Sequence, residues 1–121
     1  MMMRAIGYFQ SLPINATESL VDIELPIPTA TGHDVLVRVE AIAANPVDYK
    51  IRKNRAPQAD KAEVLGWDAA GTVVAVGELV SLFKVGDPVF YAGALNRPGA
   101  NSEFHLVDER LVGRKPQNLS F

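Results

Sequence analysis

Hydrophobic and polar residues alternate along much of the chain with the period of two that is typical of half-buried β-strands. In segment 33–45, Val35 and Val37 fall on one face, whereas the charged Arg38 and Glu40 fall on the other. Further strand-like segments are 3–9, 20–25, 69–76, 88–91 and 102–107. Five or six short strands at fairly regular spacing predict an irregular β-barrel or sandwich.

One segment, from Pro46 to about Lys53, is typical of a helix instead. Asn45 can cap its first turn, Pro46 suits the first helical position, and the Asp48 carboxylate favours the helix dipole. Helix capping is one interpretation of these residues. The other adds a ligand pocket, because Asn45 can use its side-chain oxygen on the backbone and offer its NH₂ group to a ligand. Tyr49 adds a phenol to the same short helix.

Length, composition and charge narrow the range of functions. With 121 residues, 48% hydrophobic and 21% charged, the chain is long enough for one domain with a real core. A net charge of −2, from 12 basic and 14 acidic residues, provides no electrostatic footprint for nucleic acid. No apolar run approaches the roughly 20 residues of a membrane helix. The chain has no cysteine, which excludes disulfides and thiolate zinc sites and favours a cytoplasmic location.

The glycines do not form a phosphate-binding loop. A dinucleotide fingerprint requires G-x-G-x-x-G between a strand and a helix, whereas Gly66, Gly71 and Gly77 lie five and six residues apart in strand-like sequence. We expect them to permit bends or a close approach of the backbone in a curled sheet. His33 and His105 have no nearby metal-ligating partner in the sequence, so no metal site is predicted from them.

The combined spacing of several motifs resembles a known superfamily. Residues 64–77 read Val-Leu-Gly-Trp-Asp-Ala-Ala-Gly-Thr-Val-Val-Ala-Val-Gly and are followed by Val-Gly-Asp-Pro-Val at 85–89. With the opening strand, the 32–37 strand, the 45–48 turn and the closing 108–116 segment, they resemble the medium-chain dehydrogenase/reductase superfamily. The resemblance is greatest to its quinone oxidoreductase and zinc-type alcohol-dehydrogenase-like branch. It implies a mainly β, GroES-like irregular barrel with one or two short helices.

The resemblance also implies that residues 1–121 are the N-terminal portion of a GroES-like catalytic domain, truncated before a Rossmann domain. The parent enzyme is then expected to be a homodimer or homotetramer that uses NADPH, bound mainly by the Rossmann domain. Its substrate would be a small-molecule quinone or α,β-unsaturated carbonyl compound. The fragment alone is expected to be inactive.

Departures from the superfamily pattern matter as much as the match. Zinc-dependent members place a catalytic cysteine where Asn45 stands and a ligating histidine where Trp67 stands, so no zinc is expected. Asn45 and Tyr49 are the implied catalytic residues, and Asn45, Asp48, Trp67 and Tyr91 the implied cofactor-binding residues. Without zinc, the Asn45 amide or the Tyr49 or Tyr91 hydroxyl must stabilise the substrate oxyanion.

The sequence leaves the role of Trp67 and two alternative functions open. Trp67, beside Asp68 and just before a buried strand, is either core or one wall of an aromatic pocket. The chain could also be a β-barrel interaction module without catalytic function, or part of a zinc-dependent alcohol or polyol dehydrogenase with unusual ligands. A G-x-G-x-x-G motif in a strand–helix unit beyond Phe121 favours the reductase.

Overall fold

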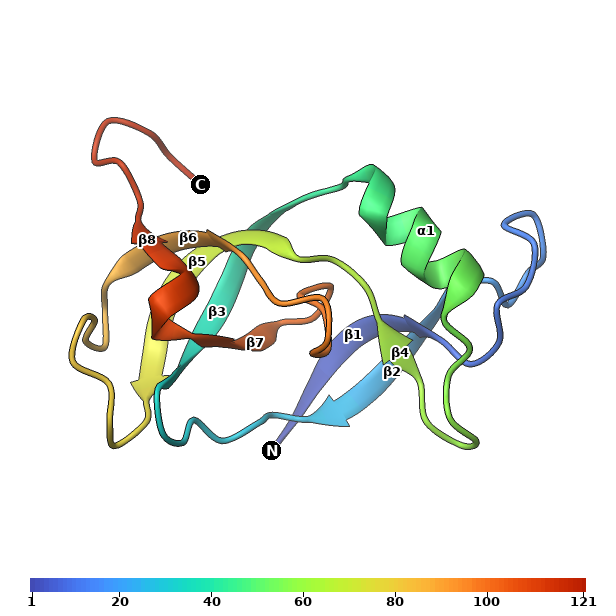
Figure 1. Ribbon diagram of the computed structural model, residues 1–121, viewed down its shortest axis with the longest axis horizontal. Coiled ribbons are helices and arrows are strands. Elements are labelled where there is room, and N and C mark those ends of the chain that lie inside the picture. Colours follow the sequence, from blue (N-terminus) through green and yellow to red (C-terminus); the bar gives the residue numbers. More distant parts are fainter.

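A computed structural model, which describes residues 1–121, has a mainly β fold (Figure 1). Its strands are β1 (Met2–Tyr8), β2 (Val21–Pro26), β3 (Asp34–Ala43), β4 (Glu63–Val64), β5 (Asp68–Val76), β6 (Pro88–Ala92), β7 (Phe104–Asp108) and β8 (Val112–Arg114). The helices are α1 (Pro46–Asn54) and the short 3-10 helix η1 (Glu109–Leu111). This architecture confirms the predicted mainly β fold with one or two short helices.

The strands form two antiparallel sheets that share a connection. The larger sheet has the order β7-β3-β5-β6-β8, and the smaller one has the order β2-β1-β4. Segment 101–103 joins them, because the Ile6 N–H donates to the Asn101 oxygen and the Val39 N–H to the Glu103 oxygen, both at 2.9 Å. This segment therefore links the two sheets.

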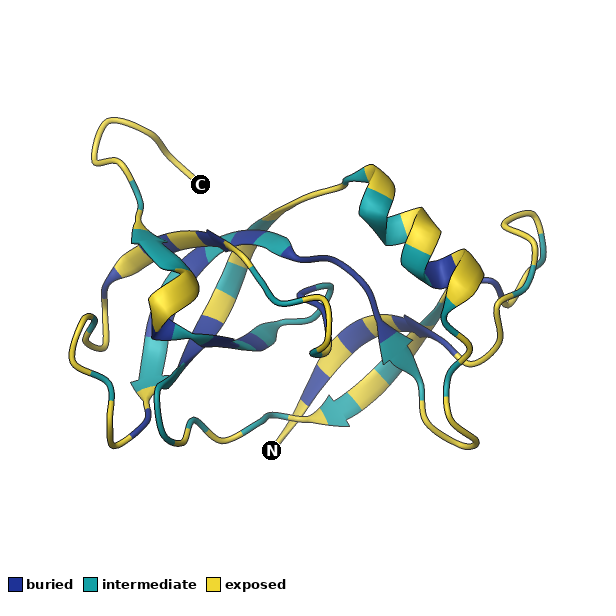
Figure 2. Cartoon of the chain, in the orientation of Figure 1, coloured by how far each residue is buried: buried dark blue, intermediate teal, exposed yellow.

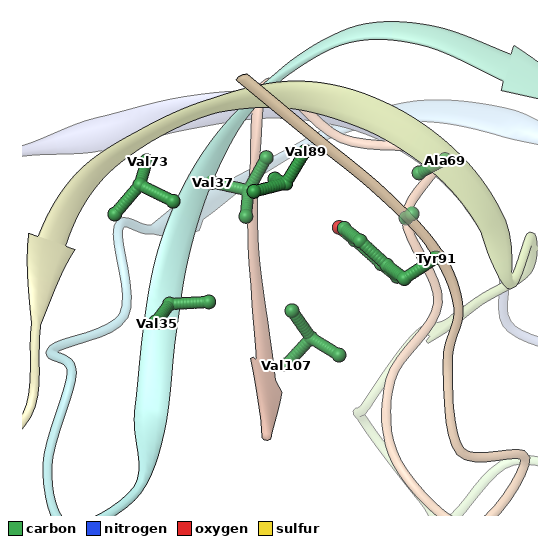
Figure 3. Close-up of a cluster of buried hydrophobic side chains, with 8 residues drawn as sticks. Val35, Val37, Ala69, Val73, Val89, Tyr91 and Val107 are labelled. Atoms are coloured by element: carbon green, nitrogen blue, oxygen red, sulfur yellow. The ribbon is translucent and has the colours of Figure 1, made fainter. Parts of the chain in front are cut away.

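The main core lies on the inner face of the five-stranded sheet, where the alternating pattern of segment 33–45 places it. Val35 and Val37 are fully buried, whereas the charged Arg38 and Glu40 are exposed. Figure 3 shows these valines converging with side chains from the neighbouring strands. The cluster consists of Val35, Val37, Ala69, Val73, Val89, Tyr91, Ala100 and Val107. Burying each valine contributes about 1.5–3 kcal/mol to the stability of the fold.

A second, smaller cluster holds α1 in place. Tyr8, Leu65 and Trp67 are buried together, and Val47 and Ile51 of the helix pack on them. The Tyr8 hydroxyl also donates to the Arg55 main-chain oxygen at 2.7 Å, just beyond the end of the helix. A helix this short is marginal in isolation, so this packing is what holds it. Figure 2 shows the exposed outer side of α1 and its partly buried inner side.

Two glycines confirm the expected roles, a close approach of backbones at Gly71 and a bend at Gly66. A Cβ atom at Gly71 would lie 2.1 Å from the main-chain oxygen of Arg38, where the pairing of β3 with β5 shifts register. Gly66 has a φ of 94°, a conformation that other residues rarely adopt, and it turns the chain into Trp67. Both glycines therefore have structural reasons to be there.

Candidate functional site

Three elements meet at the far end of β3. The strand pairs with β5 so that Ala43 lies opposite Asp68, and two residues separate this last paired residue from the start of α1 at Pro46. Asn45 occupies the junction. Its side-chain nitrogen donates to Asp68 Oδ2 at 2.5 Å and to the Ala43 main-chain oxygen at 3.3 Å. One amide therefore links the end of β3, the start of β5 and the start of the helix.

Asn45 is also the N-cap of α1, as predicted. Pro46 takes the first helical position, and the Asn45 side chain faces the Asp48 main-chain N–H in a capping box. In return, Asp48 Oδ2 accepts a hydrogen bond from the Asn45 main-chain N–H at 3.0 Å. The other carboxylate oxygen of Asp48, Oδ1, is buried without a hydrogen-bond partner. An unpaired buried oxygen at the start of a helix is unusual. It marks the junction formed by Asn45, Asp48 and Asp68, which we call the corner, as a candidate ligand site.

The contacts of Asn45 differ from the sequence expectation in one respect. An ionised carboxylate only accepts hydrogen bonds, so the atom that Asn45 turns to Asp68 must be its nitrogen. With Ala43 as the second acceptor, both N–H bonds of the amide are used within the protein. The NH₂ group is therefore not offered to a ligand, because the β3–β5 register brings a carboxylate beside it.

Asp68 faces an open groove along the outer side of the sheet. The cavity has a volume of about 740 Å³, and ten of its thirteen lining residues are hydrophobic. Ile42 and Phe90 on its walls are half-exposed. Asn45 does not line the groove itself, but its amide donates hydrogen bonds to two residues that do, Ala43 and Asp68, and so lies beside it. An apolar groove with a few polar groups is typical of small-molecule sites.

Tyr49 has a free hydroxyl at the same corner. Its side chain is 60% exposed, and the hydroxyl makes no hydrogen bond within the protein. Residues four apart lie on one side of a helix, so Tyr49 lies on the side of Asn45. Val47 and Ile51 occupy the buried side. Tyr49 therefore offers a free hydrogen-bond donor on the side of α1 that follows Asn45.

Tyr91 is placed differently, although it also borders the groove. Its hydroxyl lies in the core, as Figure 3 shows, and donates to Nδ1 of the stacked His105 ring at 2.8 Å. The His105 Nε2–H in turn donates to the Pro98 oxygen at 2.9 Å, which fixes Nδ1 as the acceptor. Burial raises the pKa of Tyr91 and lowers the pKa of His105. The Tyr91 hydroxyl is therefore not available to a ligand.

Trp67 belongs to the core beneath α1. Only 3% of it is exposed, its indole N–H donates to the Arg97 main-chain oxygen at 3.2 Å, and it is not among the residues that line the groove. Of the two interpretations of this residue, its burial favours core. Asp68, the next residue, is the site residue that sequence reasoning did not select. Its acidic side chain at the start of a buried strand was the available signal.

Residues 31–117 match the alcohol dehydrogenase GroES-like domain family. The chain belongs to this family. A protein from Staphylococcus epidermidis named "Zinc-type alcohol dehydrogenase-like protein" is 41% identical over 97% of the chain, which covers 34% of that relative. The 2-methylene-furan-3-one reductase of Solanum lycopersicum is 38% identical over 84% of the chain, which covers 28% of that relative.

Solved structures support the same family. A Rhizobium etli CFN 42 protein described as a zinc-dependent alcohol dehydrogenase is 55% identical, with a TM-score of 0.96. The match covers 100% of this chain and 35% of the Rhizobium protein. The Escherichia coli quinone oxidoreductase in complex with NADPH is 26% identical, with a TM-score of 0.77. The match covers 98% of this chain and 35% of the Escherichia coli protein. This GroES-like chain thus spans about a third of the length of the relatives that it matches.

The side chains at the corner can be tested against the groups that these names mention. The corner of this GroES-like chain offers one amide and two carboxylates, with no histidine or cysteine, and nowhere do three His, Cys, Asp or Glu residues gather as a metal site. These donors do not fit a catalytic zinc, which takes three protein ligands. An apolar groove with hydrogen-bonding groups beside it does fit a nicotinamide nucleoside. No helix is long and apolar enough to cross a membrane.

Proposed function

We propose that this chain is the N-terminal portion of the catalytic domain of an NADPH-dependent, zinc-independent oxidoreductase. Its substrates are quinones or α,β-unsaturated carbonyl compounds. Two relatives support this: the Escherichia coli enzyme is a quinone oxidoreductase in complex with NADPH, and the tomato enzyme is named as a furanone reductase. Because the chain covers about a third of such proteins, we propose that a Rossmann domain lies in the remainder of the polypeptide.

The groove and the corner beside it are the proposed binding surface of this chain. NADPH, when bound, supplies the hydride, whereas the chain orients the cofactor and excludes water. The apolar walls suit the nicotinamide ring, and Asn45 with Asp48 offers hydrogen-bonding groups beside the groove. Tyr91 contributes to the wall, and Trp67 supports Asp68 and α1 from below.

The hydroxyl of Tyr49 is the proposed donor to the substrate oxygen. Hydride addition to a quinone or an enone leaves negative charge on that oxygen, which needs a positioned donor when no metal is used. The Asn45 amide has spent both N–H bonds, and the Tyr91 hydroxyl is bound to His105. Tyr49 is the candidate that remains free, and this observation carries the proposal.

The test is the Tyr49→Phe variant of the complete polypeptide that contains this chain. Loss of an oxyanion donor should lower kcat with a quinone or an enone by about 100-fold or more and leave the fold intact. Tyr8→Phe is the matched control: it removes a hydrogen bond under α1, costs about 1 kcal/mol of stability, and keeps kcat within about twofold. An unchanged kcat in Tyr49→Phe would remove the proposed role of this hydroxyl.

A cheaper observation tests the enzyme assignment itself. A strand–helix unit with G-x-G-x-x-G, encoded after residue 121 in the same polypeptide, is the expected cofactor-binding element. A reading frame without such a unit contradicts the proposal and favours an interaction module instead.

A further inference from the structure

We propose that Asp68 is a positioning residue that fixes the polarity of Asn45, so that Asn45 presents a hydrogen-bond acceptor to the cofactor. The cofactor group bound there is then a donor, either the carboxamide N–H or a ribose hydroxyl of the nicotinamide nucleoside. This inference rests on the proposed function, since it concerns how NADPH is held. It differs from the sequence expectation, in which Asn45 donates.

The hydrogen bonds of the Asn45 side chain carry the first step. An amide can turn by 180° about its last bond, which exchanges its oxygen and nitrogen, and neighbouring groups decide which orientation is stable. Asp68 accepts from the amide nitrogen at 2.5 Å, and in the flipped orientation two oxygens would face each other. The flipped form is thereby disfavoured. The side-chain oxygen faces the first turn of α1 and has two lone pairs, so one is left for a ligand.

The charge of the corner carries the second step. The Asp48 and Asp68 carboxylates both lie close to Asn45, since Asp48 accepts a hydrogen bond from its main-chain N–H and Asp68 accepts one from its side-chain nitrogen. Negative charge near a binding site disfavours an oxyanion and favours a group that donates hydrogen bonds. The position between Asn45 and the two carboxylates therefore suits an N–H or O–H group.

The position of Asp68 in the sheet carries the third step. It is the first residue of β5 and is paired on both sides, with Ala43 of β3 and Ala92 of β6. Its neighbours Trp67 and Ala69 are buried. A side chain whose backbone is held on both sides is preorganised, which is what a positioning residue requires.

Cofactor affinity tests the inference in the complete polypeptide. The dissociation constant is measured by calorimetry for NADPH and for two analogues. One has an acetyl group in place of the carboxamide, and the other lacks the 2′-hydroxyl of the nicotinamide ribose. We expect one analogue to bind about 5- to 10-fold more weakly than NADPH, the effect of one lost hydrogen bond, and that analogue identifies the donor.

The variants then locate the cause. Asp68→Asn keeps the shape of the side chain but can itself donate a hydrogen bond, so the Asn45 amide is free to turn. The penalty, by which we mean the weaker binding of that analogue relative to NADPH, should then fall to within about twofold. Asp68→Glu keeps the carboxylate and should retain part of the penalty. Asn45→Ala removes the acceptor and abolishes the penalty. Asp22→Asn, on the exposed face of β2, is the matched control and keeps the full penalty.

Each failure has a distinct meaning. Absence of NADPH binding in the unmodified polypeptide overturns the proposed function and this inference with it. Binding of NADPH and both analogues with equal affinity leaves the proposed function in place but overturns the assignment of Asn45 as an acceptor. A penalty that survives unchanged in Asp68→Asn overturns the role of Asp68.

Discussion

The two ends of β3 each have a carboxylate nearby, and the fold treats the two differently. Near the start of the strand, Glu109 is only 2% exposed and accepts three hydrogen bonds: from His33 Nδ1 at 2.7 Å and from the main-chain N–H groups of Ser81 and Leu82 at 3.0 and 2.8 Å. Near the end, Asp68 is half-buried, accepts one hydrogen bond from Asn45 and borders an open groove.

This difference separates a structural charge from one that is available to a ligand. Burying a carboxylate is costly unless its lone pairs are occupied, and Glu109 meets that condition entirely within the protein. It thereby ties the loop after β5 to the end of β7. Asp68 keeps unoccupied lone pairs beside an apolar surface, which is the arrangement of a binding site rather than of a core.

Replacing each carboxylate by alanine gives the largest expected contrast. Glu109→Ala removes the common acceptor of three donors, so we expect it to lower the urea midpoint of unfolding more than any other variant discussed. Asp68→Ala removes one partly exposed acceptor and should cost no more than about 1 kcal/mol. Urea titrations of both variants at neutral pH provide the measurement. Equal losses in the two variants would contradict the distinction.

The same distinction predicts how stability depends on pH. The hydrogen bonds from His33, Leu82 and Ser81 lower the pKa of Glu109 below its ordinary value of 4.5. A lowered pKa in the folded state means that the ionised carboxylate contributes stability above its unfolded-state pKa, and that this contribution is lost as the pH falls through the folded-state value. Unfolding measured between neutral pH and about pH 3 should show this loss. Glu109→Gln, which does not titrate, should flatten that part of the curve, whereas a curve of unchanged slope would show that Glu109 is not the group responsible.

Much of the fold could be predicted from local pattern. The alternation around Val35 and Val37, together with the cap at Asn45 and Pro46, located β3 and α1 to within a residue or two. Strands β4 and β8, with two and three residues, were not predicted, because so few residues cannot establish a repeating alternation. Their pairing with β1 and β6 depends on tertiary structure alone.

The candidate site was less accessible, because its chemistry depends on register. The sequence identifies Asn45 and Tyr49 as polar groups on a short helix, but it does not state that Ala43 lies opposite Asp68. That pairing decides which atoms of Asn45 are occupied. Likewise, the burial of the Tyr91 hydroxyl follows from His105, fourteen residues away on β7. Long-range contacts of this kind cannot be inferred from spacing alone.

Asn45→Ala has a small expected effect on stability and separates capping from function. A lost cap costs about 1 kcal/mol, and Pro46 and the Asp48 carboxylate still favour the start of the helix in this variant. In the complete polypeptide, however, the same substitution removes the group that we propose holds the cofactor, so turnover at low NADPH should fall more than stability does. Unfolding and steady-state kinetics on one preparation give both values. A variant that loses stability but retains full turnover would reduce Asn45 to a helix cap, and the polar end of β3 would then be as purely structural as the end that holds Glu109.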